Sequence, residues 1–493
     1  MMKNKSNLGL WAAAGVCLAV FLALFSARLG WLSGFSGKRH LAPATFAAAL
    51  PDRDVWMKIL QNDRKIGYSH SVFEKEAENY RLREFMLLQV TVMGLAQRVE
   101  LQLDALLSAD LTLRSFASRL RSGQFDFSAR GEIVDKTLVV TTEAEGRPHE
   151  IRLPLDANPH LSAGMIYSVC NSGMAPGDSL TVPVFDPAGM TLVPVRVKVA
   201  QKENITIMNL VQPATRLEID FKGMTQQVWI SEQCEILRES GLMGLTIEKA
   251  DKFDALRPGE EGAANLTEMA AIPSNIVIDD PQGLNLLTVA LTGVDLAALA
   301  LDGGRQTLTG NEVTIQKEDR PSPGESEEQA GGLAAFLEPN AFIQSDDPDV
   351  RALAVEIVAP AKTDWDRAER LLRWVYLNIE KKPVVSMPNA LSTLAQRRGD
   401  CNEHAMLLAA LGRAAGIPAQ VETGLVYMNG RFFYHAWNRF YLGRWVTLDA
   451  ALGQLPADVT HIRLAGGDPD QQVNLITAIG KIRLTVTDFA PRP

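Results

Sequence analysis

The middle of the chain alternates between apolar and polar residues, which is the pattern of β-strands with one buried face. Val99, Leu101 and Leu103 are separated by polar residues, and valines alternate in the same way along residues 193–199. Residues 216–220 and 227–230 predict a hairpin whose turn is at Lys222-Gly223. Because this patterning is typical of antiparallel sheets, we predict a large β-rich domain over residues 52–314. No motif in it indicates what it binds.

The pattern changes to a helical period beyond a charged segment. Residues 317–332, KEDRPSPGESEEQAGG, bury too little apolar surface to become ordered, so they are interpreted as a linker. Residues 348–358 then predict a short helix preceded by the acidic segment Ser345-Asp346-Asp347. Thr363 and Asp366 resemble a capping box that opens a helix ending near Glu380. The apolar stripe of that helix consists of Ala368, Leu371, Leu372, Val375 and Ile379.

The amino terminus has a third pattern. A tail of residues 1–7 carries two lysines and precedes an uncharged run, Leu8–Ala27, which at about 1.5 Å per residue just crosses a hydrocarbon core of about 30 Å. No small-x-small pair directly follows the run, which favours an uncleaved signal-anchor over a cleaved secretory signal. Charges on both sides leave the positive-inside rule undecided. A short tail before a large C-terminal part is typical of a signal-anchor, so we expect a single-pass membrane protein with its bulk on the extracytoplasmic (periplasmic) side.

Composition limits the classes of function. Hydrophobic residues make up 46% and charged residues 22% of the 493 residues, which is globular composition with enough apolar material for two or three domains. The 49 Lys and Arg against 58 Asp and Glu give a net charge of −9. Nucleic-acid binding needs clustered positive charge, so it is not expected.

The four cysteines are widely spaced. They lack the Cys-x-x-Cys pairs of a zinc finger and are too few for a disulfide framework, so each is judged alone. Cys170 and Cys234 can form a disulfide if the β-rich part lies in an oxidising compartment. Two separately buried thiols are the simpler alternative. Cys17 lies within the apolar run, and Cys401 lies in the segment described next.

The segment from Arg398 to Gln454 contains the candidate chemistry. A helix is predicted from Cys401 to Gly416, and a helix N-terminus favours a thiolate at Cys401. Three strands follow, divided by turns at residues 429–430 and 442–443, with His435 in the second strand and Asp449 at the end of the third. Adjacent antiparallel strands can place His435 and Asp449 side by side, facing the helix tip. This would bring together a nucleophile, a base and an orienting carboxylate.

The sequence motifs of this segment resemble those of the transglutaminase-like superfamily, whose core is papain-like. The resemblance covers residues 339–467, and residues 468–493 are expected to form a C-terminal strand and tail. One departure is Ala450, where relatives commonly have proline after the aspartate. The matching motifs are Gly399-Asp400-Cys401 with Glu403-His404-Ala405, Tyr434-His435-Ala436-Trp437, and Trp445-Val446-Thr447-Leu448-Asp449. The implied fold class is α+β: a transmembrane helix, an antiparallel β-rich domain and a transglutaminase-like α+β domain.

By this resemblance Cys401 is the nucleophile, His435 the general base and Asp449 the residue that orients the imidazole. The Cys401 backbone N–H would donate to the oxyanion, and Gln396 is a candidate for the second donor. The expected activity is hydrolysis of an amide bond in a protein or peptide without a cofactor, and a cell-envelope protein or peptide is one candidate substrate. Amine transfer and a non-catalytic binding scaffold are the alternatives. Coordination of a metal by Cys401, His404 and His435 is a further alternative, but only three ligands are at hand. The sequence gives no indication of oligomeric state.

Overall fold

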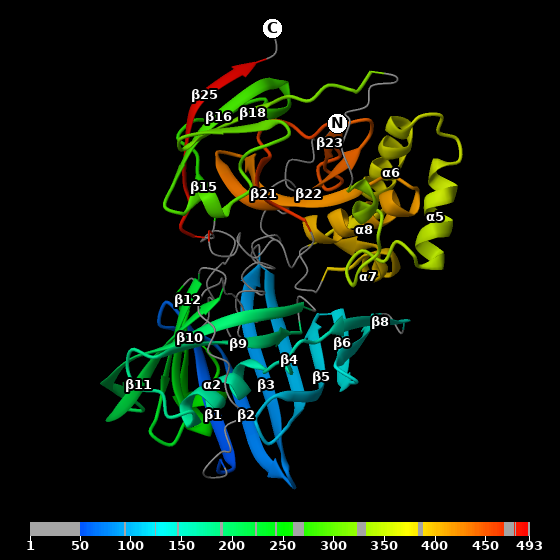
Figure 1. Cartoon of the computed structure of the whole chain (residues 1–493). Coiled ribbons are helices and arrows are strands. Elements are labelled where there is room, and N and C mark those ends of the chain that lie inside the picture. Colours follow the sequence, from blue (N-terminus) through cyan, green and yellow to red (C-terminus); the bar gives the residue numbers. More distant parts are fainter. Residues whose placement is uncertain are drawn as a thin grey trace. The chain divides into compact units, whose positions relative to one another are not determined.

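The computed structural model describes residues 50–491, apart from 93–94, 124, 145–146, 188–190, 222–223, 242–243, 260–270, 323–331, 383–387, 468–477 and 479. These residues divide into two compact units, one ending before residue 266 and one beginning there (Figure 1). The predicted tail and anchor, residues 1–7 and Leu8–Ala27, lie outside the described residues. Within the described ranges, no helix is both long and apolar enough to cross a membrane.

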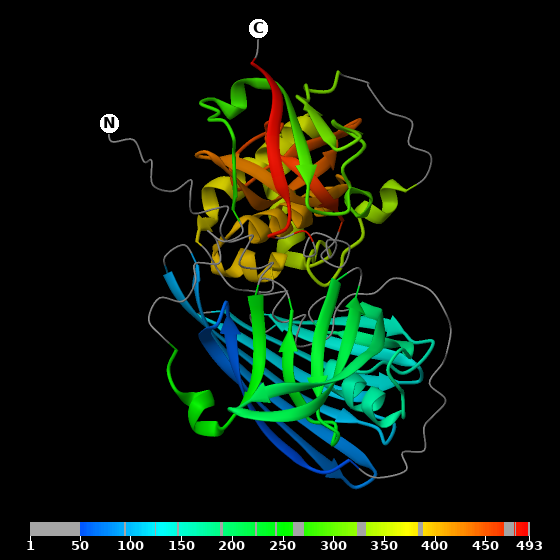
Figure 2. The same ribbon diagram turned by 90° about the vertical axis from the view of Figure 1, so that its left-hand side faces the viewer.

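The first unit is one antiparallel sheet of 14 strands, in the order β8-β7-β6-β5-β4-β3-β2-β1-β14-β13-β12-β11-β10-β9. Most neighbours in the sheet are also neighbours along the chain, and the pairing of β1 with β14 joins the two halves. Figure 2 shows that this sheet is strongly curved. Its strands are β1 (Arg53–Gln61), β2 (Arg64–Glu76), β3 (Asn79–Val92), β4 (Leu95–Leu107), β5 (Leu113–Ser122), β6 (Phe125–Val134), β7 (Thr137–Ala144), β8 (Arg147–Pro154), β9 (Ser179–Asp186), β10 (Thr191–Ile207), β11 (Leu210–Phe221), β12 (Met224–Ile230), β13 (Ile236–Ser240) and β14 (Leu245–Ala250), and its helices are α2 (Ser162–Asn171) and α3 (Lys252–Leu256).

The alternation seen in the sequence produces the core of this unit. Val99, Leu101 and Leu103 of β4 are buried, as are the four valines of β10, and β11 pairs with β12 as the predicted hairpin. One face of the sheet also packs against α2, whose Tyr167 ring lies 4.8 Å from the ring of Phe73 on β2. A disulfide joins Cys170, in α2, to Cys234 after β12. Of the two alternatives that the sequence left open for these cysteines, the structure has the disulfide rather than two separate thiols, and this bond fastens the helix to the segment after β12.

The described part of the second unit contains two larger sheets, one two-stranded parallel pair and a group of helices. The larger sheet has the order β15-β22-β21-β24 with β23 on β22, and the smaller has the order β17-β18-β16-β25. The helices are α5 (Pro348–Val358), α6 (Asp364–Asn378), α7 (Ala390–Gln396) and α8 (Cys401–Ala414), with 3-10 turns at Pro281–Gly283, Leu296–Ala298 and Leu333–Phe336. The strands are β15 (Ile272–Pro273), β16 (Leu284–Thr292), β17 (Gln306–Thr309), β18 (Glu312–Gln316), the parallel pair β19 (Glu380–Lys381) and β20 (Arg398–Gly399), β21 (Ala419–Met428), β22 (Arg431–Tyr441), β23 (Trp445–Leu448), β24 (Ile462–Gly466) and β25 (Arg483–Pro491).

The predicted end of the β-rich domain at residue 314 differs from the structure. β16 and β18 fall in the second unit, where β16 pairs with the C-terminal strand β25. Alternation identifies a strand but not its partner, so it could not show that these strands belong with residues near the end of the chain. The described part of the predicted linker 317–332 is also tied to this unit, because Glu318 accepts hydrogen bonds from Thr447 and Arg320 pairs with Asp366.

The predicted helices are confirmed. Asp347 caps α5, and Thr363 caps α6 by accepting a hydrogen bond from the Asp366 N–H. Helix α8 is buried on nearly all sides from Cys401 to Arg413, since the other helices cover the face that turns away from the sheet. It packs closely on β22 at Gly412, where an added Cβ would lie 2.4 Å from the Phe440 ring.

Candidate active site

Cys401 is the first residue of α8, as the sequence predicts. The preceding Asp400 caps the helix by accepting from the Asn402 N–H at 2.7 Å, while Glu403 accepts from the Asp400 N–H at 2.9 Å. This reciprocal capping box fixes the turn that presents the thiol. The Cys401 Sγ is buried and accepts a hydrogen bond from the backbone N–H of Ala436, which places it beside the strand that carries His435.

The surroundings of Cys401 favour the neutral thiol, in contrast to the thiolate expected from the helix terminus. Burial raises the pKa of the Cys401 thiol, and the nearby Asp400 carboxyl raises it further, whereas the Ala436 N–H opposes both. Burial and the adjacent Glu403 also raise the pKa of Asp400. Desolvation thus outweighs the helix dipole at this position. A mechanism that starts from this arrangement needs a base to remove the thiol proton.

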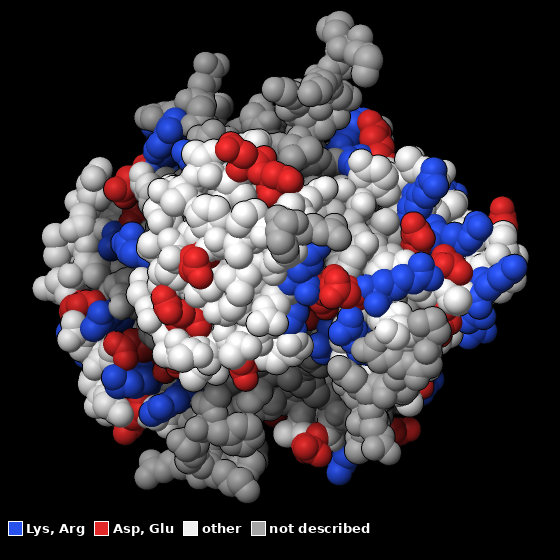
Figure 3. Space-filling view, turned by 90° about the horizontal axis from the view of Figure 1, so that it is seen from above, with Lys and Arg blue, Asp and Glu red and all other residues white. Residues whose placement is uncertain are grey.

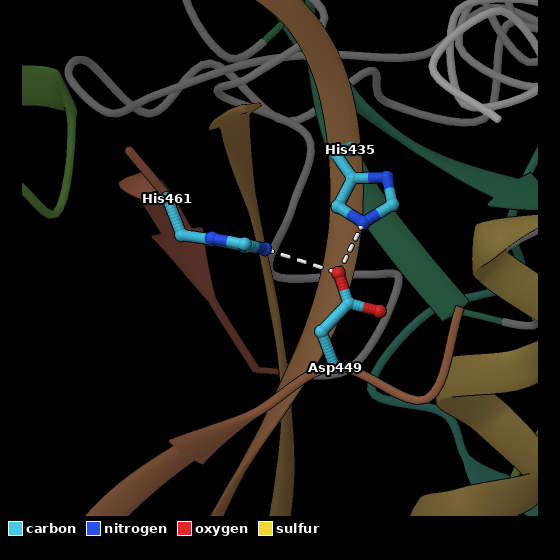
Figure 4. Close-up of side chains that lie close together, drawn as sticks. All are labelled: His435, Asp449 and His461. Carbon is cyan, nitrogen blue, oxygen red and sulfur yellow. Dashed lines mark hydrogen bonds and ion pairs between the residues drawn. The ribbon is translucent and has the colours of Figure 1, made fainter. Parts of the chain in front are cut away.

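His435 and Asp449 come from adjacent strands and meet directly (Figure 4). The pairing of Asn438 with Leu448 sets the register of β22 and β23, and Asp449 follows the last residue of β23. The His435 Nε2 lies 2.7 Å from the Asp449 Oδ2, and both side chains are fully buried. In Figure 4 the Nδ1 of His435 points away from Asp449, and this atom is buried without a hydrogen-bond partner. It is the ring nitrogen left to accept a proton.

A second histidine, which the sequence analysis did not single out, binds the same carboxylate. The Nε2 of His461 lies 3.0 Å from the Asp449 Oδ2, and its Nδ1 lies 3.2 Å from the Asp458 Oδ1. The other oxygen of Asp449 accepts from the backbone N–H groups of Ala451 and Leu452. Asp449 is therefore held on every side, by two imidazoles and two amides.

The buried charges in this group stabilise one another. Burial would raise the pKa of Asp449, but His435 and His461 outweigh it and hold the pKa well below its usual range. Burial would lower the pKa of His461, but Asp458 and Asp449 raise it to about 9. His461 is therefore a buried imidazolium between two carboxylates at neutral pH.

The other predicted residues, His404 and Gln396, lie close to Cys401 in the sequence. His404 is buried, with its Nδ1 2.6 Å from the Asp400 carbonyl oxygen, and burial lowers its pKa to about 4. Gln396 ends α7 and is partly buried, and its role as an oxyanion donor stays a prediction. Burial lowers the pKa of Lys381, on β19, to about 8, and the nearby negative charge of Asp449 opposes this effect only in part.

The potential metal ligands differ from those considered in the sequence. Among the described residues, the ligand atoms that gather within 4.8 Å are those of His435, Asp449 and His461, rather than Cys401, His404 and His435. Both Nε2 atoms already lie at hydrogen-bond distance from one carboxylate oxygen, whereas a metal would need to lie about 2 Å from each ligand atom. The arrangement fits a hydrogen-bonded relay better than a metal centre.

His461 left little signal in the sequence. It follows the turn Asp458-Val459-Thr460, in which the Asp458 carboxylate accepts from the N–H and the hydroxyl of Thr460. Such Asp-x-Thr turns are common in loops, so the turn alone indicates no function. The histidine meets Asp449 because β24, which begins at the next residue, pairs with β21.

The surface agrees with the charge balance. On the face seen in Figure 3, blue and red side chains are mixed at the right of the view, red groups are scattered over the largely white area beside them, and no large blue field is visible. The described residues of this face therefore show no clustered positive charge of the kind that binds nucleic-acid backbones.

Comparisons with known proteins give the family of this domain. Residues 351–450 match the family model described as "Transglutaminase-like superfamily". No curated protein matches the chain.

Similar solved structures include a candidate cysteine protease from Cytophaga hutchinsonii, at 20% identity over 42% of this chain and 84% of that chain with a TM-score of 0.28. Another is the periplasmic domain of TgpA from Pseudomonas aeruginosa bound to ethylmercury, at 14% identity over 59% and 94% with a TM-score of 0.23. These TM-scores are low, so the assignment depends on the matched segment and its motifs. The second unit therefore contains, at residues 351–450, a segment that matches the transglutaminase-like superfamily.

Proposed function

We propose that this chain is a cysteine-nucleophile enzyme that hydrolyses an amide bond of a protein or peptide through Cys401, His435 and Asp449. The observation that carries the proposal is the bond between the His435 Nε2 and the Asp449 Oδ2, which leaves the Nδ1 unpartnered on the strand next to the thiol. A carboxylate on one ring nitrogen keeps the proton there, so the other nitrogen is a base.

The reaction follows from this arrangement. The His435 Nδ1 takes the thiol proton as the Cys401 Sγ attacks the amide carbonyl, and the new C–S bond gives a tetrahedral oxyanion. The Cys401 backbone N–H, with Gln396 as a candidate second donor, stabilises that charge. Collapse breaks the C–N bond while His435 returns the proton to the leaving amine. Water then loses a proton to His435, attacks the thioester and releases the acid with the thiol restored. The thiol is buried, so substrate binding has to expose it.

The same acyl-enzyme can pass its acyl group to an amine. Water is far more concentrated than any amine, so hydrolysis is the expected outcome unless a pocket excludes water from the thioester. A transglutaminase-like fold used as a non-catalytic binding scaffold is the other alternative. In that case Cys401 is a buried thiol without special reactivity.

One experiment separates these three functions. The full chain is incubated with unfolded casein in the presence of a biotinylated primary amine, and both new peptide ends and incorporated biotin are measured. We expect peptide release without biotin incorporation, and neither with Cys401→Ala. Biotin incorporation that depends on Cys401 would favour amine transfer. A Cys401 that reacts with iodoacetamide no faster than an ordinary exposed thiol would favour the scaffold.

We also propose that the chain is anchored by residues 8–27 with its bulk outside the cytoplasm. The apolar run supports the anchor, and the Cys170–Cys234 disulfide supports an oxidising compartment. A reporter that is active only outside the cytoplasm, fused after Pro493, should therefore be active and fractionate with membranes. Activity of a reporter that works only in the cytoplasm would contradict this orientation.

A further inference from the structure

The contacts of His461 give it a function that the proposed Cys401–His435–Asp449 mechanism does not use. Its ring is fully buried, and each of its two nitrogens faces a carboxylate oxygen, of Asp449 on one side and of Asp458 on the other. A carboxylate can only accept, so both nitrogens have to donate, and this requires the doubly protonated imidazolium. Geometry alone thus assigns a positive charge behind Asp449.

The loop that carries His461 is built to keep the ring in place. Arg305, nearly buried, donates to the carbonyl oxygens of Ala457, Asp458 and His461, and it also lies 3.6 Å from the Glu318 carboxylate. Asp458 is fixed by Thr460 and by the Gln454 amide, which donates to its Oδ2 at 2.9 Å. The Trp437 ring meets the imidazole edge-on, with 5.2 Å between the ring centroids. These contacts aim the Nε2–H of His461 at Asp449.

We propose that His461, held by Asp458, is a positioning residue that clamps Asp449 beneath His435 and tunes the proton affinity of His435 with its positive charge. The proposal rests on the proposed function of Cys401, His435 and Asp449. The ring centroids of His461 and His435 are 5.8 Å apart, a distance at which one buried charge shifts a neighbouring pKa by about one unit or more. At His435, the positive charge of His461 opposes the negative charge of Asp449.

Other charged groups also act on this centre. Asp400 and Glu403 at the tip of α8, and Lys381 on β19, face the same group of residues, and Arg305 and Glu318 lie behind the 457–461 loop. None of these residues is altered in the test, so their contributions are common to the variants that are compared.

The test measures the pH dependence of Cys401 alkylation by iodoacetamide in the full chain, followed by mass spectrometry of the peptide that contains Cys401. Reaction through the thiolate with a protonated His435 gives a bell-shaped profile. His461→Gln keeps a donor toward Asp449 but removes the charge. Losing a positive charge makes the thiolate less stable and the His435 imidazolium more stable, so both limbs should move toward higher pH by about one unit. On the acid limb this is about a tenfold slower reaction.

The controls separate a charge effect from damage to the fold. His160→Gln makes the same substitution at a buried histidine of the first unit, and it should leave both limbs in place. A role confined to structure would lower the height of the bell without moving the limbs, and unchanged limbs in folded His461→Gln would overturn the proposal. If that variant does not fold, the charge of His461 is tested in the parent protein, as follows.

A measurement on the parent needs no variant. Selective ¹⁵N labelling of the 7 histidines should show one imidazole with both nitrogens protonated at neutral pH, which titrates near pH 9 and disappears in His461→Gln. A neutral His461 at pH 7 would overturn the proposal. If parental Cys401 shows no enhanced alkylation at any pH while the imidazolium is present, the proposed enzyme function fails but the charge assignment stands.

Discussion

Cys401→Ala should abolish amide hydrolysis, and His435→Ala should reduce it about 10³-fold or more. In the proposed mechanism Cys401 provides the atom that holds the acyl group, and alanine cannot form the thioester. His435 provides a buried ring nitrogen without a hydrogen-bond partner on the strand beside the thiol, so in the proposed mechanism its loss leaves a neutral thiol without its base. The measurement is peptide release from casein by each folded variant.

The matched control for thiol loss is the double change Cys170→Ala and Cys234→Ala. It removes a disulfide of the first unit and should leave the rate per folded molecule within a few-fold of the parent, which is on the order of 1 kcal/mol or less in activation free energy. Parental activity in Cys401→Ala would exclude the thiol mechanism and leave the scaffold function in its place.

Asp449→Asn should lower activity by about 10²- to 10⁴-fold and also destabilise the second unit. Oδ2 of Asp449 accepts from two histidines, and Oδ1 accepts from two backbone amides. An asparagine replaces one of these oxygens with an NH₂ donor. In either orientation this NH₂ group faces two N–H donors and can accept a hydrogen bond from neither. Each buried donor left without a partner costs about 1–3 kcal/mol, and His461 also loses one of its two counter-charges.

The two effects of Asp449→Asn are measured separately, as the rate per folded molecule and as the midpoint of thermal unfolding. For a unit of this size the midpoint should fall by about 2–4 °C per kcal/mol lost. Asp347→Asn is the control, because asparagine caps a helix as well as aspartate does and α5 should be unaffected. An Asp449→Asn variant with parental rate and midpoint would show that the carboxylate neither orients His435 nor balances His461.

The stability of this centre should fall both at acidic and at alkaline pH. The pKa of Asp449 is held below its usual range, so its contribution is present at neutral pH and is lost as the pH falls. The pKa of His461 is raised to about 9 from an ordinary value of 6.5, so its contribution is complete below pH 6.5 and is lost as the pH rises through about 9. Both contributions to the free energy of unfolding are fully present only above the usual pKa range of an aspartate and below pH 6.5.

The sequence by itself determined the local elements and the positions of the candidate site residues on them. The alternation along residues 99–103 and 193–199 requires strands with one buried face, and the caps at Asp347 and Thr363 define where two helices begin. The sequence also predicts where Cys401, His435 and Asp449 lie, on a helix tip and on two neighbouring strands. This was possible because turns at residues 429–430 and 442–443 fix how the strands fold back on one another. Local patterns of this kind depend on residues close together in the chain.

The tertiary structure decided what depends on distant partners. β16 belongs with β25 because of backbone pairing that no local pattern encodes, so the boundary expected at residue 314 is displaced. The state of Cys401 depends on how completely α8 is covered, and this burial outweighs the helix dipole that the sequence shows. His461 joins Asp449 only because β24 lies beside β21, which brings a histidine from an ordinary turn against a buried carboxylate. Burial and long-range pairing, rather than residue type, made these features.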